Sequence, residues 1–320
     1  MKLLVTGGAG FIGSNFIRHM MSSRHDLEII NLDILTYAGN LNNLKGIEKN
    51  SGYTFVKGDI CNRDIVNAIL DKHKVDAIVH FAAESHVDRS ITHASAFVMT
   101  NVLGTQNLLE CARIHTVPEF IHISTDEVYG STMEGSFKET DNLSPSSPYS
   151  ASKAGSDLLA LSYYTTYNLP VIITRCTNNF GPYQFPEKLI PLFVTNLLDG
   201  KKVPVYGTGK NIRDWIHVSD HCRAIEFLLE RGNPGEIYNI GGGHEKTNLE
   251  ITQKILDLLS MDSSMIEYVT DRPGHDFRYS LDCSKLHAMG WKPKYSFDEA
   301  LEGTITWYTH NQWWWRPLKR

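Results

Sequence analysis

The sequence lacks the patterns that mark several large protein classes. Its five cysteines, an odd number, form no Cys-x-x-Cys pair, and no cluster of histidine, cysteine and acidic residues has metal-ligand spacing. No apolar run reaches the roughly 18 residues of a membrane-spanning helix, and no signal-peptide pattern precedes the first predicted strand. The formal net charge of −5 is not gathered in long runs of one sign, which argues against nucleic acid or a membrane as a general partner. We therefore expect a cytoplasmic protein with free thiols and without a metal ion.

The chain is long and apolar enough to build a large core. Of its 320 residues, 42% are hydrophobic and 21% are charged, as in a globular protein of one large or two closely packed domains. Over the first 180 residues, short apolar runs alternate with helical stretches. The predicted strands are Lys2–Thr6, Glu28–Asp33, Tyr53–Lys57, Ala77–Phe81, Phe120–Ser124 and Val171–Arg175, and the predicted helices include Ile12–Ser22, Arg63–His73, Ala94–His115 and Ala151–Asn168. This alternation predicts an α/β fold with a doubly wound, Rossmann-type parallel sheet.

The rhythm changes after about Gly181, where prolines break the chain and the segments become shorter. The predicted elements there are helices near Ser219–Glu230, Asn248–Leu259 and Phe297–Thr309 and strands near Val203–Tyr206 and Ile237–Ile240. We therefore predict a Rossmann domain over residues 1–180 and a smaller mixed α/β lobe over 181–320, with exchange of chain between the two. The three tryptophans Trp313–Trp315 are interpreted as a packing anchor, with an oligomer contact as the alternative.

A glycine-rich turn follows the first predicted strand directly. Gly7, Gly10 and Gly13 let backbone N–H groups approach a pyrophosphate at the start of the next helix, whose apolar face begins with Phe11 and Ile12. Asp33 ends the second strand, 20 residues past Gly13, where a carboxylate binds a ribose 2′-hydroxyl and repels a 2′-phosphate. The pattern favours NAD over NADP. The alternative is a structural glycine turn with a helix-capping aspartate.

A tyrosine and a lysine stand four residues apart, at Tyr149 and Lys153, and would share one face of a helix. A nearby cation lowers the pKa of a tyrosine, which can then take a proton from a sugar hydroxyl while hydride leaves for a nicotinamide. Thr125, at the end of the fifth strand, could hydrogen-bond the same hydroxyl. The alternative is an exposed aromatic residue and a surface lysine.

Two carboxylates follow Thr125 at once, at Asp126 and Glu127. If C4 of a hexose is first oxidised to a ketone, a base can remove the acidified C5 proton while an acid protonates the C6 hydroxyl, and water leaves. Return of the hydride to C6 gives a 4-keto-6-deoxy sugar. Adjacent carboxyl groups in a poorly solvated pocket repel each other and separate in pKa, as one acid and one base require. The alternative is a helix-capping or solvent-facing Asp-Glu turn.

The glycine turn, Asp33, Thr125 and the Tyr149/Lys153 pair together resemble the extended short-chain dehydrogenase/reductase family, over nearly the whole chain. The resemblance implies a nucleotide-sugar-binding C-terminal lobe and a homodimer joined by a four-helix bundle, built by the helices near Ala94 and Ala151. It also assigns Glu127 as the C5 base and Asp126 as the C6 acid. The runs 82–90 and 124–130 resemble the members that dehydrate dTDP-glucose. Other nucleotide-sugar 4,6-dehydratases, 4-epimerases and a non-catalytic NAD sensor stay as alternatives.

The same resemblance implies the remaining ligand-binding residues. For NAD these are Thr36, Asp59, Ile60, Ala82, Ala83, Ser85, Thr100 and Asn179, beside the glycine turn, Asp33, Tyr149 and Lys153. For the substrate they are Ser85, His86, Thr125, Asn178, Glu187, Lys188, Leu189, Pro204, Tyr206, Arg213, Asn248, Arg272 and His275. An arginine can bind a diphosphate bidentately, which agrees with this set in kind. Asp59 could equally be a helix cap, and His86 and His275 could be ordinary polar histidines.

Overall fold

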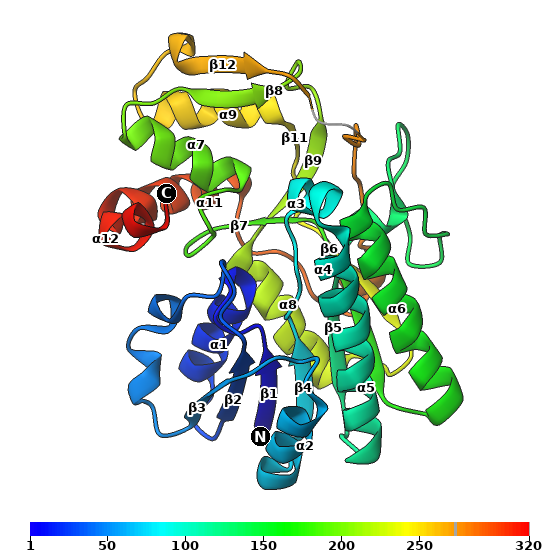
Figure 1. Ribbon diagram of the computed structural model, residues 1–320. Helices are drawn as coiled ribbons and strands as arrows, with labels where there is room; N and C mark the ends of the chain where they lie inside the picture. Colours follow the sequence, from blue (N-terminus) through cyan, green and yellow to red (C-terminus); the bar gives the residue numbers. More distant parts are fainter. Residues whose placement is uncertain (272–273, 320) are drawn as a thin grey trace.

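The computed structural model describes residues 1–271 and 274–319, which form a parallel sheet with helices on both faces and a smaller lobe above it (Figure 1). The seven strands of the sheet run in the order β10-β6-β5-β4-β1-β2-β3, and every neighbouring pair is parallel. Their bounds are β1 Lys2–Thr6, β2 Glu28–Asp33, β3 Tyr53–Lys57, β4 Ala77–His80, β5 Phe120–Thr125, β6 Val171–Cys176 and β10 Ile237–Ile240. The predicted Rossmann-type fold is confirmed.

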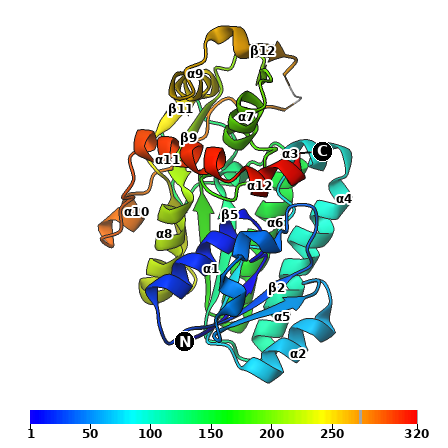
Figure 2. The same ribbon diagram turned by 90° about the vertical axis from the view of Figure 1, so that its left-hand side faces the viewer.

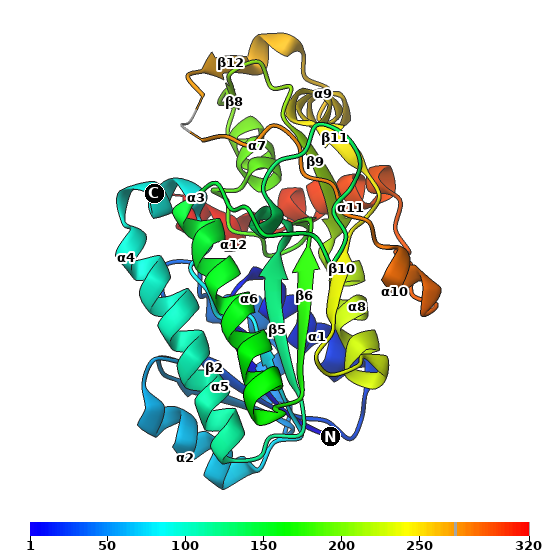
Figure 3. The same ribbon diagram turned by 90° about the vertical axis from the view of Figure 1, so that its right-hand side faces the viewer.

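Alternate side chains of the strands enter two separate cores. Leu3 and Val5 of β1 pack with α1 (Phe11–Ser23) and α8 (Val218–Arg231) on one face of the sheet. Leu4 packs on the other face, where α2 (Arg63–His73), α5 (Thr105–Ile114) and α6 (Pro148–Tyr167) lie. Figure 3 shows α5 and α6 in front of the sheet and α1 and α8 behind it. Burial on both faces explains why most of these strands are near-continuous apolar runs, whereas the edge strand β3 is only partly buried.

Two helices differ from their predicted bounds in ways that affect the site. The helix expected over 94–115 is divided into α4 (Ala94–Phe97), a π-helical segment Val98–Gly104 and α5. Helix α6 begins at Pro148 rather than at Ala151, because Ser147 caps it in a capping box with Ser150 and Pro148 occupies its first position. Tyr149 therefore lies inside the first turn of the helix.

The chain returns to the large sheet after residue 181. β10 pairs with β6 at the sheet's edge, and α8 packs against α1. The short helix α10 (Ser284–Ala288) contributes Leu286 to the same core. Residues of the second half of the chain thus complete the Rossmann sheet, while the exact position of a domain boundary stays a prediction.

The smaller lobe stands above the carboxyl ends of the strands (Figure 1). It contains a two-stranded sheet, β8 (Val203–Tyr206) with β12 (Ile266–Val269), and a three-stranded sheet of β7 (Asn178–Phe180), β9 (Ile212–His217) and β11 (Glu245–Thr247). Its helices are α7 (Leu189–Leu198), α9 (Asn248–Leu258), α11 (Phe297–His310) and α12 (Gln312–Trp315), and the short helix α3 (Val87–Thr92) faces it from below. Trp314 and Trp315 are buried in the core of this lobe, whereas Trp313 is 48% exposed. Within the described residues, no helix combines the length and the apolar character needed to cross a bilayer.

Candidate active site

A cavity opens at the carboxyl ends of β1, β2, β4, β5 and β6, the edge at which open α/β sheets bind ligands. All of the residues predicted for the cofactor line it. They are Gly7, Gly10, Phe11, Ile12, Gly13, Asp33, Thr36, Asp59, Ile60, Ala82, Ala83, Ser85, Thr100, Tyr149, Lys153 and Asn179. The structure therefore brings together residues that the sequence spreads from position 7 to position 179.

The glycine turn leaves no room for side chains. Gly7 has φ +70°, and a Cβ atom there would lie 2.5 Å from the backbone nitrogen of Ala82. A Cβ atom on Gly13 would lie 2.4 Å from the carbonyl oxygen of Gly7. The turn is closed by a hydrogen bond from Gly10 N–H to the same oxygen, at 3.1 Å. This geometry exposes the first turn of α1 to the cavity, as a pyrophosphate site requires.

Two backbone N–H groups fix the carboxylate of Asp33, one from the glycine turn and one from the segment that follows β2. Its Oδ2 accepts the N–H of Ala9 at 2.9 Å, and its Oδ1 accepts the N–H of Leu35 at 2.8 Å. Burial raises the pKa of this carboxyl group, while the two backbone hydrogen bonds oppose the shift. Both oxygens keep lone pairs for a ribose hydroxyl.

The five residues predicted to carry the chemistry line the same cavity: Thr125, Asp126, Glu127, Tyr149 and Lys153. Thr125 ends β5, and its hydroxyl donates to Oδ1 of Asp126 at 3.2 Å. Burial raises the pKa of Asp126 well above its usual range, and the negative charge of Glu127 adds to the shift. A raised pKa favours the protonated form of Asp126, which is the form that a general acid needs.

The Tyr149 phenol differs from the sequence-based expectation. Burial raises its pKa well above the usual value, and the negative charge of Glu127 raises it further. A hydrogen bond with Thr125 acts in the opposite direction. The ammonium group of Lys153 instead donates to the carbonyl oxygen of Ile123 at 2.7 Å. The expected lowering of the tyrosine pKa is therefore wrong, because the pKa of Tyr149 is raised.

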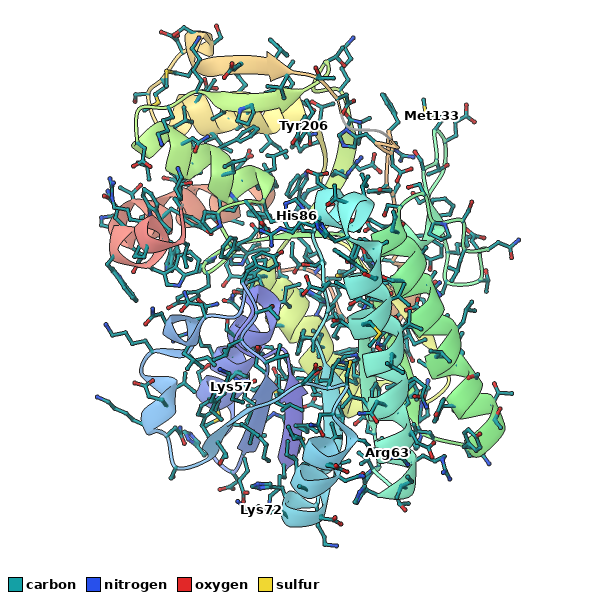
Figure 4. The ribbon with its side chains drawn as sticks, viewed as in Figure 1. Lys57, Arg63, Lys72, His86, Met133 and Tyr206 are labelled. Atoms are coloured by element: carbon teal, nitrogen blue, oxygen red, sulfur yellow. The ribbon has the colours of Figure 1, made fainter. Side chains whose placement is uncertain are left out.

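The predicted substrate residues divide into two groups. Ser85, Asn178, Glu187 and Lys188 line the cavity together with Thr125. The imidazole of His86 lies 3.6 Å from the Glu187 carboxylate and so borders it, and Figure 4 shows His86 at the junction of the sheet and the smaller lobe.

The others are not brought to the lining of the cavity. They are Leu189 at the start of α7, Pro204 and Tyr206 in β8, Arg213 in β9, Asn248 at the start of α9, and His275, which pairs with Asp271 at 2.6 Å. Arg213 is buried and holds the backbone carbonyls of Asp276 and Phe277, although its charge still reaches Asp126 and lowers the pKa of that carboxyl. Arg272 lies outside the described residues. The reason is architectural, because these residues belong to lobe elements farther from the sheet edge.

Sequence reasoning missed a group that crosses the cavity. The Tyr37 hydroxyl donates to Glu187 at 2.8 Å, and the Arg89 guanidinium lies 3.6 Å from the centre of the Tyr37 ring and donates to Glu187 at 3.2 Å. Phe185 packs edge-on against Tyr37, and Lys188 donates to the Ser85 carbonyl at 2.9 Å. The position of Tyr37 directly after Thr36, itself expected at the cofactor, is the one signal that could have indicated it.

A Rossmann sheet with an NAD-type turn, a Tyr/Lys pair and two carboxylates at one cavity defines an extended short-chain dehydrogenase/reductase equipped for elimination. The family model described as GDP-mannose 4,6 dehydratase matches residues 4–304. The chain is 54% identical to the dTDP-glucose 4,6-dehydratase of Streptomyces niveus over 324 residues, which covers 100% of this chain and 96% of the relative. It is 51% identical to the enzyme of that name from an Actinoplanes species, covering 98% and 100% of the two chains.

Solved structures agree with these relatives. The crystal structure of DesIV, a dTDP-glucose 4,6-dehydratase from Streptomyces venezuelae with NAD and TYD bound, matches with a TM-score of 0.97 and 55% identity over 100% of both chains. A UDP-glucose 4-epimerase from Thermus thermophilus in complex with NAD matches with a TM-score of 0.90 and 30% identity, covering 97% and 99% of the two chains. The chain belongs to the family of 4,6-dehydratases that contains the dTDP-glucose enzymes.

Proposed function

We propose that this chain is a hydro-lyase that converts dTDP-glucose into dTDP-4-keto-6-deoxyglucose and water with retained NAD, as its relatives' names indicate. The observation that carries the proposal is the Asp126–Glu127 pair beside Tyr149 and Lys153 in one cavity. A 4-epimerase needs only the tyrosine, the lysine and a hydroxyl. Two carboxyl groups, one of them with a raised pKa, add the means to eliminate water.

NAD fits the cavity on the evidence of the backbone. A Cβ at Gly7 or Gly13 would collide with the backbone of Ala82 or Gly7, so the glycines allow the tight turn that leaves Gly7, Gly10 and Gly13 at the cavity. Asp33 presents a fixed carboxylate at the end of β2. A 2′-phosphate would meet that carboxylate as a like charge. When bound, NAD supplies a positively charged nicotinamide that accepts the substrate's C4 hydride and later returns it to C6.

In the first step, Tyr149 takes the proton of the C4 hydroxyl, which Thr125 orients by hydrogen bonding. Because burial disfavours the phenolate of Tyr149, a positive charge close to the phenol would favour it. Lys153 lies one helical turn farther along α6 and lines the same cavity. Its bond to the Ile123 carbonyl holds the ammonium group at the end of β5.

In the second step, Glu127 removes the C5 proton and Asp126 protonates the leaving C6 hydroxyl. The raised pKa of Asp126 supports its role as the acid of the pair. Its neighbour Glu127 lies at the cavity as well and can accept the proton from C5. As C6 is reduced, Glu127 returns a proton to C5. Because C4 stays a ketone, the proton held by Tyr149 is released to solvent and Asp126 takes one up, which restores the starting state of the protein.

Ser85, His86, Asn178, Glu187 and Lys188 are proposed to bind the sugar and the phosphates, since they line or border the cavity. The remaining residues expected for the substrate are proposed to hold the nucleotide above the sheet edge. Figure 4 shows Tyr206 in the smaller lobe, beyond the same end of the strands as His86, whereas Lys72 lies at their other end. The proposal also divides the chain into an NAD-binding Rossmann domain over residues 1–180 and a nucleotide-sugar-binding lobe over residues 181–320.

A homodimer joined by a four-helix bundle is part of the proposal. Large apolar side chains are exposed on the helical segments 94–114 and on α6, namely Val98, Met99, Leu103, Ile114, Leu158, Tyr164 and Tyr167, with exposed fractions between 37% and 59%. An exposed apolar surface of this kind indicates a contact with another protein chain.

The five cysteines are free, which supports the proposal of a cytoplasmic location.

Incubation of the purified protein with dTDP-glucose, without added NAD, tests the function. We expect a product lighter by one water that carries a 4-keto group, identified by mass spectrometry. Conversion to the galacto epimer without a mass change would favour a 4-epimerase. Activity with another nucleotide-glucose and none with dTDP-glucose would favour a different 4,6-dehydratase.

A further inference from the structure

The C-terminal helix α12 reaches the glycine turn through one side chain. Trp314, 2% exposed, donates its indole N–H to Oδ1 of Asn43 at 2.7 Å, although 271 residues separate the two. Asn43, 1% exposed, donates from Nδ2 to the carbonyl oxygen of Ala9 at 2.9 Å. Figure 2 shows α12 between the smaller lobe and the part of the sheet domain that contains α1.

The two hydrogen bonds permit one orientation of the Asn43 amide. An indole N–H only donates, and a backbone carbonyl only accepts. Trp314 must therefore face the amide oxygen, which leaves the amide nitrogen for Ala9. If the indole donor were removed, the buried Oδ1 of Asn43 would lose its partner and the amide would lose the contact that fixes its orientation.

Three hydrogen bonds hold the backbone of Ala9 within the glycine turn. Its N–H is held by Asp33, and its carbonyl oxygen accepts both Asn43 and the backbone N–H of Asn40, the latter at 2.9 Å. Since the peptide unit is planar, a fixed Ala9 carbonyl also fixes the N–H of Gly10, which closes the turn on Gly7. The first N–H groups of α1 take their direction from this arrangement.

From this chain of contacts we infer that Trp314 is a positioning residue for the dinucleotide, acting through Asn43 on the Ala9–Gly10 peptide. The inference rests on the proposed binding of NAD at the glycine turn. It assigns the C-terminal tryptophans two separate tasks. Trp315 is equally buried, but its indole donates to the carbonyl oxygen of Tyr308 at 2.8 Å, within the C-terminal segment. Trp314 alone of the two donates toward the turn.

The test is exchange of protein-bound NAD against isotope-labelled NAD in the holoenzyme, followed by rapid filtration. Trp314→Phe is expected to exchange about tenfold faster than the unmodified protein, the factor associated with one buried hydrogen bond. Trp315→Phe is the matched control, because it removes the same donor from the adjacent buried residue. It is expected to lower the melting temperature comparably and to leave the exchange rate unchanged.

Asn43→Asp examines the link from its other side. The carboxylate still accepts from Trp314 but offers no N–H to Ala9, so faster exchange is expected here as well. In the double variant Trp314→Phe/Asn43→Asp the two effects should not add, because both break one chain of contacts.

Equal exchange rates in Trp314→Phe and Trp315→Phe, or additive effects in the double variant, would overturn the inference. Neither measurement needs substrate or turnover. A protein that holds no NAD at all would contradict the proposed function instead, so the two failures are distinguishable.

Discussion

The ammonium group of Lys153 donates to the backbone carbonyl oxygen of Ile123, at 2.7 Å, in the interior of the protein. The lysine of the Tyr/Lys pair is thereby anchored to β5, the strand that carries Thr125 at its end. Burial lowers the pKa of Lys153 to about 8, against the opposing charge of Asp157 on the same helix. The positive charge of Lys153, which the proposed first step uses, is therefore lost at a lower pH than the charge of an ordinary lysine.

The first prediction concerns the pH dependence of turnover. Lys153 is a base with a lowered pKa, so it is charged below about pH 8 and loses its charge as the pH rises through that value. Turnover should decline over the same range. Lys153→Arg, whose guanidinium stays charged, should be slower but should lose this alkaline limb. A pH–rate profile of both proteins decides, and an identical limb in the variant would assign it to another group.

The second prediction separates the two carboxyl groups. Glu127→Gln removes the proposed base, so C4 oxidation should still occur, seen as absorbance of the reduced cofactor, with little exchange of the C5 proton with solvent. Asp126→Asn removes the proposed acid, so C5 exchange should persist while loss of water falls by about 10²-fold or more. Deuterium incorporation followed by mass spectrometry measures both. Normal C5 exchange in Glu127→Gln would reassign the base.

The third prediction concerns a buried ion pair behind the site. The carboxylate of Asp157 is fully buried, accepts Nε of Arg175 at 2.9 Å and lies 3.4 Å from Nε2 of His122. Burial opposes the charge on Asp157, but the hydrogen bond with His122 and the charge of Arg175 outweigh it and lower the pKa. Asp157→Ala leaves Arg175 charged and without this partner, so the free energy of unfolding should fall by about 3–5 kcal/mol.

The control for this variant is Asp298→Ala. Asp298 pairs with Lys254 at 2.8 Å, but its side chain is 70% exposed. Its loss should lower the free energy of unfolding by less than about 1 kcal/mol. Urea unfolding of both variants and of the unmodified protein measures the two losses. Comparable losses in the two variants would mean that burial does not govern the strength of the Asp157 pair.

The fourth prediction addresses the proposed dimer. Leu158 on α6 is 59% exposed, and its replacement by arginine should dissociate the dimer by placing a charge in the helix bundle. Met133 is more exposed, at 69%, and Figure 4 shows it on a loop away from these helices, so Met133→Arg is the control. Sedimentation velocity measures the mass of each. An unmodified protein that sediments as a monomer would contradict the proposal.

Much of the fold was readable from local sequence. The strands predicted in the first 180 residues agree with the structure at their starts and to within one residue at their ends. Burial on both faces of a parallel sheet makes most of these strands near-continuous apolar runs in the sequence. The glycine turn and Asp33 could also be predicted from a short segment of the sequence. The structure gives the reason for the glycine at position 7, because its close approach to Ala82 permits no side chain there.

Contacts between distant segments were decided by the tertiary structure alone. Ile237–Ile240 was predicted as a strand, but its place at the edge of the Rossmann sheet depends on how the chain returns past α8. Tyr37 meets Glu187 across 150 residues, and Trp314 meets Asn43 across 271. No periodicity records such pairs.

The sequence by itself therefore determined the elements, the cofactor turn and the residue types at the site. The tertiary structure decided the pKa values of these side chains. The same side chains in water would have ordinary pKa values, and it is enclosure that raises the pKa of Asp126 and lowers that of Lys153. Enclosure depends on the packing of the whole chain, because a charge loses its solvation only when every surrounding element is in place.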